Sequence, residues 1–275
     1  MLNSEVVMTA YPSPNKETWA SGAAYESYVG RWSQLVAREF LRWLNVPAHS
    51  RWLDVGCGTG ALSQSILELA APGRITGLDR SAEQVAFARA RVSAERAQFA
   101  VGDAQSLAVE TGTCQAAVSG LMLNFIPDPR RAVTEMTRVV KAAGVVAAYV
   151  WDYAGKMQLM RHFWNAAAAL DPAARDLDEG RRFPLCQPEP LHDLFHSAGL
   201  SDVEVRPVDI ATDFRDFDDY WQPFLGGQGP APGYVRSLTA EPRETLREQI
   251  KAGLPFALDG SIPLVARAWA VRGYR

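Results

Sequence analysis

Cysteine is scarce in this chain, which has 275 residues and only three cysteines, Cys57, Cys114 and Cys186. An odd number of widely spaced cysteines does not suit a disulfide framework and is typical of reduced thiols. The stretch Met1–Trp19 also lacks a basic start followed by an apolar segment, so it does not resemble a secretory signal. Both observations favour a cytoplasmic protein.

Long apolar runs and clusters of basic residues are scarce as well. The longest apolar run, residues 142–151, is too short to span a bilayer. The formal net charge is −3, and the chain lacks the basic stripe that a nucleic-acid groove requires. We therefore expect neither a membrane nor a nucleic acid as a partner, and the sequence does not indicate an oligomeric state. The hydrophobic content of 48% suffices for one large domain.

Glycine, by contrast, is concentrated where a short strand-like segment meets a predicted helix. Leu53 and Val55 favour a strand, Gly56, Gly58 and Gly60 follow, and the next residues favour a helix. Because glycine lacks a Cβ atom, the backbone can take positive φ and a ligand can approach it closely. The free N–H groups of the following helix point toward the same place. This segment therefore predicts a ligand-binding cradle.

Two interpretations compete for this loop. Gly56-x-Gly58-x-x-Ala61 fits the fingerprint of dinucleotide-binding proteins, which would indicate a nicotinamide-dependent oxidoreductase. Asp54, two residues before the first glycine, favours another ligand, because a carboxylate repels a pyrophosphate and attracts an ammonium group. Asp79, at the end of the next predicted strand, suits the ribose hydroxyls in either case and does not discriminate.

From residue 51 onward, predicted strands and helices alternate, which is typical of a parallel sheet covered by helices on both faces. The predicted strands cover residues 51–55, 74–78, 98–101, 114–119, 144–151, 203–208 and 263–272. The predicted helices cover residues 19–45, 61–71, 81–96, 129–141, 157–170, 188–198 and 241–251.

The same pattern predicts how the chain is divided. Residues 1–18 are polar, contain proline and lack periodicity, and we expect a mobile leader there. Residues 19–275 are expected to form a single domain. Its cofactor-binding core would be residues 51–151, while residues 152–187 and 213–259 would be helical insertions that form a lid over the substrate.

The run DVGCGTG at residues 54–60 resembles the first motif of the class I S-adenosylmethionine-dependent methyltransferases. The later segments follow that family's order, with Gly102-Asp103-Ala104 after the third strand and a helix that begins at Pro129. The similarity is closest to the small-molecule branch that includes quinone-biosynthesis methyltransferases, known as methyltransferase type 11. It implies a Rossmann-like α/β fold with a seven-stranded, mostly parallel sheet and an antiparallel last strand. Helices would cover both faces, with helical insertions after strand five and between strands six and seven.

The resemblance also implies the cofactor, S-adenosyl-L-methionine, with S-adenosyl-L-homocysteine as its product. In that family the glycine loop holds the methionine part, the acid after strand two accepts the ribose hydroxyls, and the acid after strand three accepts the adenine amino group. The residues that correspond here are Tyr28, Arg31, Asp54, Gly56, Cys57, Gly58, Gly60, Asp79, Arg80, Gly102, Asp103, Ala104 and Leu121.

Several of these residues have simpler roles open to them. Asp79 could oppose the dipole of the following helix, and Asp103 could start a turn. Cys57 is expected to be a small filler, and Arg31 could be a surface charge. The aromatic segment around Tyr28 could pack on the sheet, cap the cofactor, or do both.

The acceptor side is less defined by the sequence. The two insertions and the end of strand five carry aromatic residues expected to line a substrate pocket, Trp151, Tyr153, Trp164, Phe183 and Trp221. Methyl transfer depends mainly on in-line alignment, and a base is needed only if the acceptor must lose a proton. His162 is the candidate base. The expected function is methyl transfer to a small, partly apolar acceptor, with an oxidoreductase or a non-catalytic S-adenosylmethionine-binding protein as alternatives.

Two further motifs favour no added function. Residues 192–196, His-Asp-Leu-Phe-His, imitate the zinc motif His-Glu-x-x-His, but aspartate replaces the glutamate and no third ligand is evident. We therefore expect no metal. Residues 124–127, Asn-Phe-Ile-Pro, lack the central prolines that base-amino methyltransferases carry at this point, which disfavours nucleic-acid substrates.

Overall fold

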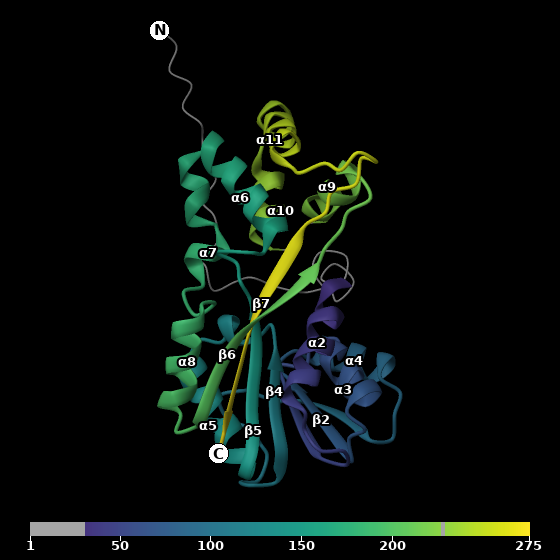
Figure 1. Ribbon diagram of the computed structural model, residues 1–275, viewed down its shortest axis with the longest axis vertical. Helices are drawn as coiled ribbons and strands as arrows, with labels where there is room; N and C mark the ends of the chain where they lie inside the picture. Colours follow the sequence, from purple (N-terminus) through teal and green to yellow (C-terminus); the bar gives the residue numbers. More distant parts are fainter. Residues whose placement is uncertain (1–30, 227–228) are drawn as a thin grey trace.

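The computed structural model describes residues 31–226 and 229–275, which form a seven-stranded sheet flanked by helices (Figure 1). The strand order is β3-β2-β1-β4-β5-β7-β6. Strands β1 to β5 pair in parallel, and β7 is antiparallel to both β5 and β6. The mostly parallel sheet with an antiparallel last strand is thus confirmed. The strands are β1 Arg51–Val55, β2 Arg74–Asp79, β3 Ala97–Val101, β4 Cys114–Gly120, β5 Val140–Trp151, β6 Ser201–Ala211 and β7 Val265–Tyr274.

Helices cover both faces of the sheet because neighbouring residues of a strand point to opposite sides. On β1, Trp52 packs with Phe40 and Ile66 on the face that α2 and α3 cover, while Leu53 packs with Val133 on the face of α5 and α8. The helices are α2 Arg31–Leu44, α3 Ala61–Leu69, α4 Ala82–Arg91, α5 Pro129–Val139, α6 Gln158–Leu170, α7 Glu179–Arg182, α8 Pro188–Ser197, α9 Phe217–Leu225, α10 Pro230–Ser237 and α11 Ala240–Gly253.

The helices that follow β5 and β6 form a layer of their own. Helices α6, α7, α9, α10 and α11 gather beyond the carboxyl ends of the parallel strands, at the top of Figure 1. They pack on one another through aromatic side chains. Phe163 stacks on Phe224 with ring centroids 4.5 Å apart, and the Tyr220 hydroxyl donates a 2.8 Å hydrogen bond to the Leu159 carbonyl. This layer therefore covers the edge of the sheet where parallel sheets bind ligands.

Several predicted boundaries differ from the structure. The helix predicted to reach residue 96 ends at Arg91. Residues 230–237 lie outside the predicted helices but form α10, where Pro230 takes the first helical position. Residues 171–187, between two predicted helices, contain a 3-10 turn and α7, because the side chains of Asp171 and Asp178 cap them at Ala173 and Gly180.

The predictions about the cysteines, membrane-spanning helices and the N-terminal residues can be compared with the structure as follows. All three cysteines are buried and free. Among the described residues, no helix combines the length and the apolarity needed to cross a bilayer. The predicted leader, residues 1–18, and the first part of the predicted helix 19–45 lie outside the described residues.

Candidate active site

The glycine loop leaves β1 and enters α3 through three left-handed residues. Gly56, Gly58 and Gly60 have φ of 72°, 50° and 83°. A Cβ on Gly56 would lie 2.4 Å from Cγ of Met122, and one on Gly60 would lie 2.9 Å from Cγ2 of Val92. A Cβ on Gly58 would meet no atom within 4 Å. Gly56 and Gly60 are therefore required for packing, whereas Gly58 borders open space.

Asp54 lies fully buried beneath this loop. Its Oδ2 accepts a 2.7 Å hydrogen bond from the Ser63 hydroxyl on α3, while its Oδ1 has no partner among the described residues. The pKa of this carboxyl is raised to about 7, mainly by burial and to a smaller extent by the nearby charge of Asp79, while the hydrogen bonds from Ser63 lower it. A buried, half-satisfied carboxylate calls for a donor or a cation. An ammonium group would supply both.

Asp79 connects the glycine loop to the end of β2. Its Oδ2 accepts the Gly58 N–H at 3.0 Å, and its Oδ1 accepts the Ser81 N–H at 2.9 Å. Ser81 itself caps α4 by accepting the Gln84 N–H at 3.3 Å. Each carboxylate oxygen can accept more than one hydrogen bond, so Asp79 keeps capacity for a ligand's hydroxyls. The carboxylate therefore braces the loop and stands at the ligand-binding edge.

Cys57 is a packing residue. Its thiol is buried against α4 in a cluster with Val85, Ala88 and Phe99. Burial, together with the charges of Asp54 and Asp79, raises the pKa of the Cys57 thiol far above its usual range. A thiol held neutral in this way is a poor nucleophile.

The end of β3 lies next to the end of β2. The Gly102 N–H donates to the Asp79 carbonyl at 3.0 Å. Asp103 is exposed, and its Oδ1 accepts the backbone N–H of Gln105 at 2.9 Å and the Gln105 side-chain amide at 3.3 Å. These bonds, with smaller contributions from Arg131 and Arg80, lower the pKa of the Asp103 carboxyl. Asp103 thus starts a turn and also presents an ionised carboxylate at the rim, beside Ala104, which packs against the core of the α5 face.

The end of β4 completes the edge with an unusual backbone conformation. Leu121 has φ of 58°, and its N–H donates to the Tyr149 carbonyl at 2.8 Å. A left-handed leucine costs of order 1–3 kcal/mol and persists only where its surroundings hold it. The next residue, Met122, is the one that contacts Gly56. The strained turn therefore meets the glycine loop directly.

The predicted pocket aromatics fall into two groups. Trp151, Trp164 and Trp221 are buried in the core of the α2 and insertion side, where Trp164 donates to Glu179 at 2.5 Å. Tyr153 and Phe183, in contrast, are only partly buried, and their ring centroids lie 5.6 Å apart.

A third aromatic residue joins this pair. Phe125, in the 3-10 turn Leu123–Phe125 after β4, meets Phe183 edge to face at 5.1 Å and is 37% exposed. Phe125 is not among the predicted pocket residues, although an aromatic residue soon after the end of β4 is a signal that the sequence contains. We call Phe125, Tyr153 and Phe183 the aromatic surface.

The structure describes the predicted base, His162, but not Tyr28 or the side chain of Arg31, two of the residues predicted to bind the cofactor. His162 lies half-buried on α6, and desolvation lowers the pKa of its imidazole. Its neighbour Arg161 pairs with Asp178. Tyr28 and the side chain of Arg31 lie outside the part of the chain that the structure describes.

The histidine pair at 192 and 196 is on α8, away from this edge. The rings stack with centroids 6.1 Å apart, and α8 packs along β6 and β7. Within residues 31–226 and 229–275, no group of three or more His, Cys, Asp or Glu side chains could hold a metal ion.

Comparisons with known proteins agree with this geometry. Residues 53–148 match the family described as "Methyltransferase domain". The 2-methyl-6-phytyl-1,4-hydroquinone methyltransferase of Spinacia oleracea is 35% identical over 156 residues, which cover 57% of this chain and 41% of that protein. The demethylmenaquinone methyltransferase of Roseiflexus castenholzii is 28% identical over 178 residues, 60% of this chain and 73% of that protein.

A solved structure shows the same fold over nearly the whole chain. Phosphoethanolamine N-methyltransferase 2 of Haemonchus contortus, in complex with phosphomonomethylethanolamine and S-adenosylhomocysteine, superposes with a TM-score of 0.57 at 18% identity, covering 92% of this chain and 57% of that one. The chain spans only 41–50% of the length of three plant hydroquinone methyltransferases that it matches. The chain therefore shares the fold of this solved methyltransferase, and its core at residues 53–148 matches the methyltransferase-domain family.

Proposed function

We propose that this protein is an S-adenosylmethionine-dependent methyltransferase that acts on a small, partly apolar acceptor. The observation that carries the proposal is the buried Asp54 carboxylate, whose Oδ1 lacks a partner among the described residues beneath a loop that opens at Gly58. An ammonium group at Oδ1 would satisfy it, whereas a pyrophosphate would place like charges together. This favours an amino-acid tail over a dinucleotide.

The remaining strand ends suit the other parts of the cofactor. Asp79 would accept the ribose hydroxyls with the lone pairs left after the Gly58 and Ser81 bonds. Asp103 would accept the adenine amino group, and Ala104 would lie beside the ring. When bound, the cofactor supplies an electrophilic methyl group on a sulfonium. The residues of the chain bind and orient it.

Rate acceleration would come mainly from alignment of the acceptor with that methyl group. Holding two reactants in line can lower the barrier by roughly 7–11 kcal/mol. Leu121 and Met122, at the contact between the β4 end and the glycine loop, would border the transfer position. Desolvation lowers the pKa of His162 and so favours the neutral imidazole, the form that could accept a proton from a hydroxyl acceptor.

The aromatic surface supports a flat acceptor. Phe125, Tyr153 and Phe183 present partly exposed rings at the ends of β4 and β5, and the Arg182 guanidinium lies 5.5 Å from the Phe183 centroid. Rings and a nearby cation would suit a phenolic or hydroquinone ring. The names of the spinach and Roseiflexus relatives point to acceptors of that class. The insertions, residues 152–187 and 213–259, would close over the acceptor as a lid.

The test combines binding and turnover. We expect S-adenosylhomocysteine, and not NAD or NADP, to raise the melting temperature. We also expect labelled methyl from S-adenosylmethionine to appear on a soluble hydroquinone. Stabilisation by a nicotinamide dinucleotide alone would contradict the proposal, and binding of S-adenosylhomocysteine without transfer to hydroquinones, phenols or amines would favour a non-catalytic binding protein.

A further inference from the structure

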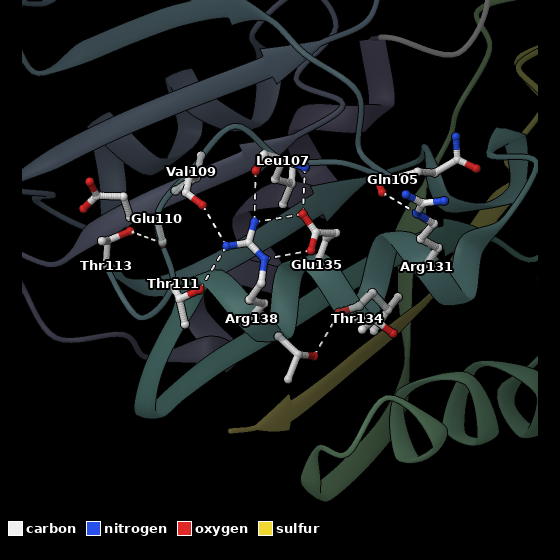
Figure 2. A network of polar contacts seen from close by, with 12 residues as sticks. Gln105, Leu107, Val109, Glu110, Thr111, Thr113, Arg131, Thr134, Glu135 and Arg138 are labelled. Carbon is white, nitrogen blue, oxygen red and sulfur yellow. Dashed lines mark hydrogen bonds and ion pairs between the residues drawn. The ribbon is translucent and has the colours of Figure 1, made fainter.

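The segment between β3 and β4 is fastened to α5 by side chains. Figure 2 shows the Arg138 guanidinium in a fork with Glu135, with Nε to Oε1 at 2.7 Å and Nη2 to Oε2 at 2.8 Å. Its other donors reach the Leu107 carbonyl at 2.9 Å, the Val109 carbonyl at 2.9 Å and the Thr111 hydroxyl at 3.1 Å. All five guanidinium N–H groups are therefore used. The segment is held as a rigid part of the fold.

Gln105 continues this attachment toward the cofactor edge. Its carbonyl accepts the Arg131 Nε–H at 2.8 Å, and its side-chain Oε1 accepts the Asp128 N–H at 3.1 Å. Asp128 caps α5 by accepting the Arg131 N–H at 2.9 Å. Figure 2 shows Gln105 beside Arg131 at this end of the network. One residue thus joins the segment after β3 to the start of α5.

The other contacts of Gln105 fix the carboxylate of Asp103. The backbone N–H and the side-chain amide of Gln105 both donate to Oδ1 of Asp103, at 2.9 and 3.3 Å. Two donors on one oxygen set the plane of the carboxylate and keep it ionised. The second oxygen, Oδ2, is then oriented as an acceptor for a donor that arrives from the cofactor edge. The exocyclic amine of adenine is such a donor, and a purine without that amine is not.

We propose that Gln105 is a positioning residue that sets the preference for adenine over other purine rings by orienting Asp103. This rests on the proposed function, which places the nucleoside at the ends of β2 and β3. The side chain of Gln105 does not itself contact the ligand in this account. The hydrogen bond from the Asp128 N–H at the start of α5 holds the Gln105 side chain in place, and that side chain in turn orients the carboxylate of Asp103.

The experiment measures discrimination between two bases. Calorimetry would give the affinity of S-adenosylhomocysteine and of its purine-riboside analogue, in which hydrogen replaces the 6-amino group. Gln105→Met keeps the length of the side chain and removes both of its hydrogen bonds. Gln105→Glu keeps the acceptor for the Asp128 N–H and removes the donor to Asp103. Gln222→Ala, at an exposed position of α9, is the matched control.

We expect the wild type and Gln222→Ala to prefer S-adenosylhomocysteine. Both Gln105 variants should lose about fivefold of that preference, the usual net worth of one hydrogen bond, while the affinity for the analogue stays unchanged. A general loosening of the site would weaken both ligands equally and would overturn the inference. A full preference in Gln105→Met would also overturn it. A wild type that binds neither nucleoside would instead overturn the proposed function.

Discussion

Removal of the charge of Asp54 should abolish a pH dependence that the structure builds into ligand binding. Burial shifts the pKa of this carboxyl from its ordinary 3.8 to about 7. Ionisation of Asp54 in the ligand-free protein therefore costs on the order of 4 kcal/mol relative to the unfolded chain. The neutral Asp54 carboxyl therefore contributes stability to the ligand-free fold that is fully present below pH ~4 and is lost progressively as the pH rises through about 7.

A ligand that carries an ammonium group needs the ionised carboxylate, so its binding must release the proton of Asp54. With a pKa of about 7 in the free protein, the affinity for S-adenosylhomocysteine should rise about tenfold between pH 6 and pH 8 and then level off. Calorimetry in buffers of different ionisation enthalpy should count close to one proton released near pH 6 and almost none near pH 8.

Asp54→Asn keeps an acceptor for the Ser63 hydroxyl and cannot ionise. Its affinity should be low and flat with pH, and the ligand-free variant should be more stable than the wild type at pH 8. Ser63→Ala is the counterpart, because loss of its hydrogen bond raises the pKa of Asp54 and moves the rise in affinity to higher pH. A wild-type affinity that does not change with pH, or an equal rise in Asp54→Asn, would refute the reasoning.

Three other predictions follow from the loop and the aromatic surface. Asp79→Ala should weaken S-adenosylhomocysteine by ~1–3 kcal/mol in calorimetry, and should also lower the melting temperature because the Gly58 N–H loses its acceptor; unchanged affinity would remove Asp79 from the site. Gly58→Ala should fold, with ~1–2 kcal/mol of positive-φ strain, and should lose affinity for the ligand. Gly56→Ala should lose more stability, because its Cβ would collide with the Met122 side chain. Equal denaturant midpoints for the two variants would contradict this. Phe183→Ala should raise KM for a hydroquinone severalfold and leave the affinity for S-adenosylhomocysteine unchanged in direct binding; an unchanged KM would remove the aromatic surface from the acceptor site.

Local signals explain which parts of the fold could be predicted. The bounds of β1 and the start of α3 follow directly from the local sequence, because alternating apolar residues, glycines and a helical period are all short-range features. The residues at the strand ends could be selected for the same reason, since parallel strands bring their carboxyl ends to one edge. Asp79 and Asp103 are candidates on this ground, and Asp54 is a candidate because it precedes the first glycine of the loop.

Long-range contacts explain what the sequence could not supply. Gln105 matters because Asp128 and Arg131 are brought to it by the packing of α5, over 23 and 26 residues of chain. In the sequence, Trp164 and Trp221 are as good candidates for an acceptor pocket as Phe183. The packing of the insertion helices nevertheless buries both tryptophans. The raised pKa of Asp54 likewise depends on burial, which no local pattern reports.

A crystal structure of the S-adenosylhomocysteine complex would show which group lies at the buried Asp54 carboxylate. We expect the α-amino nitrogen within hydrogen-bond distance of Oδ1 of Asp54, the ribose at Asp79 and the adenine at Asp103. A homocysteine tail bound elsewhere, or a dinucleotide phosphate resting on Gly58, would contradict it.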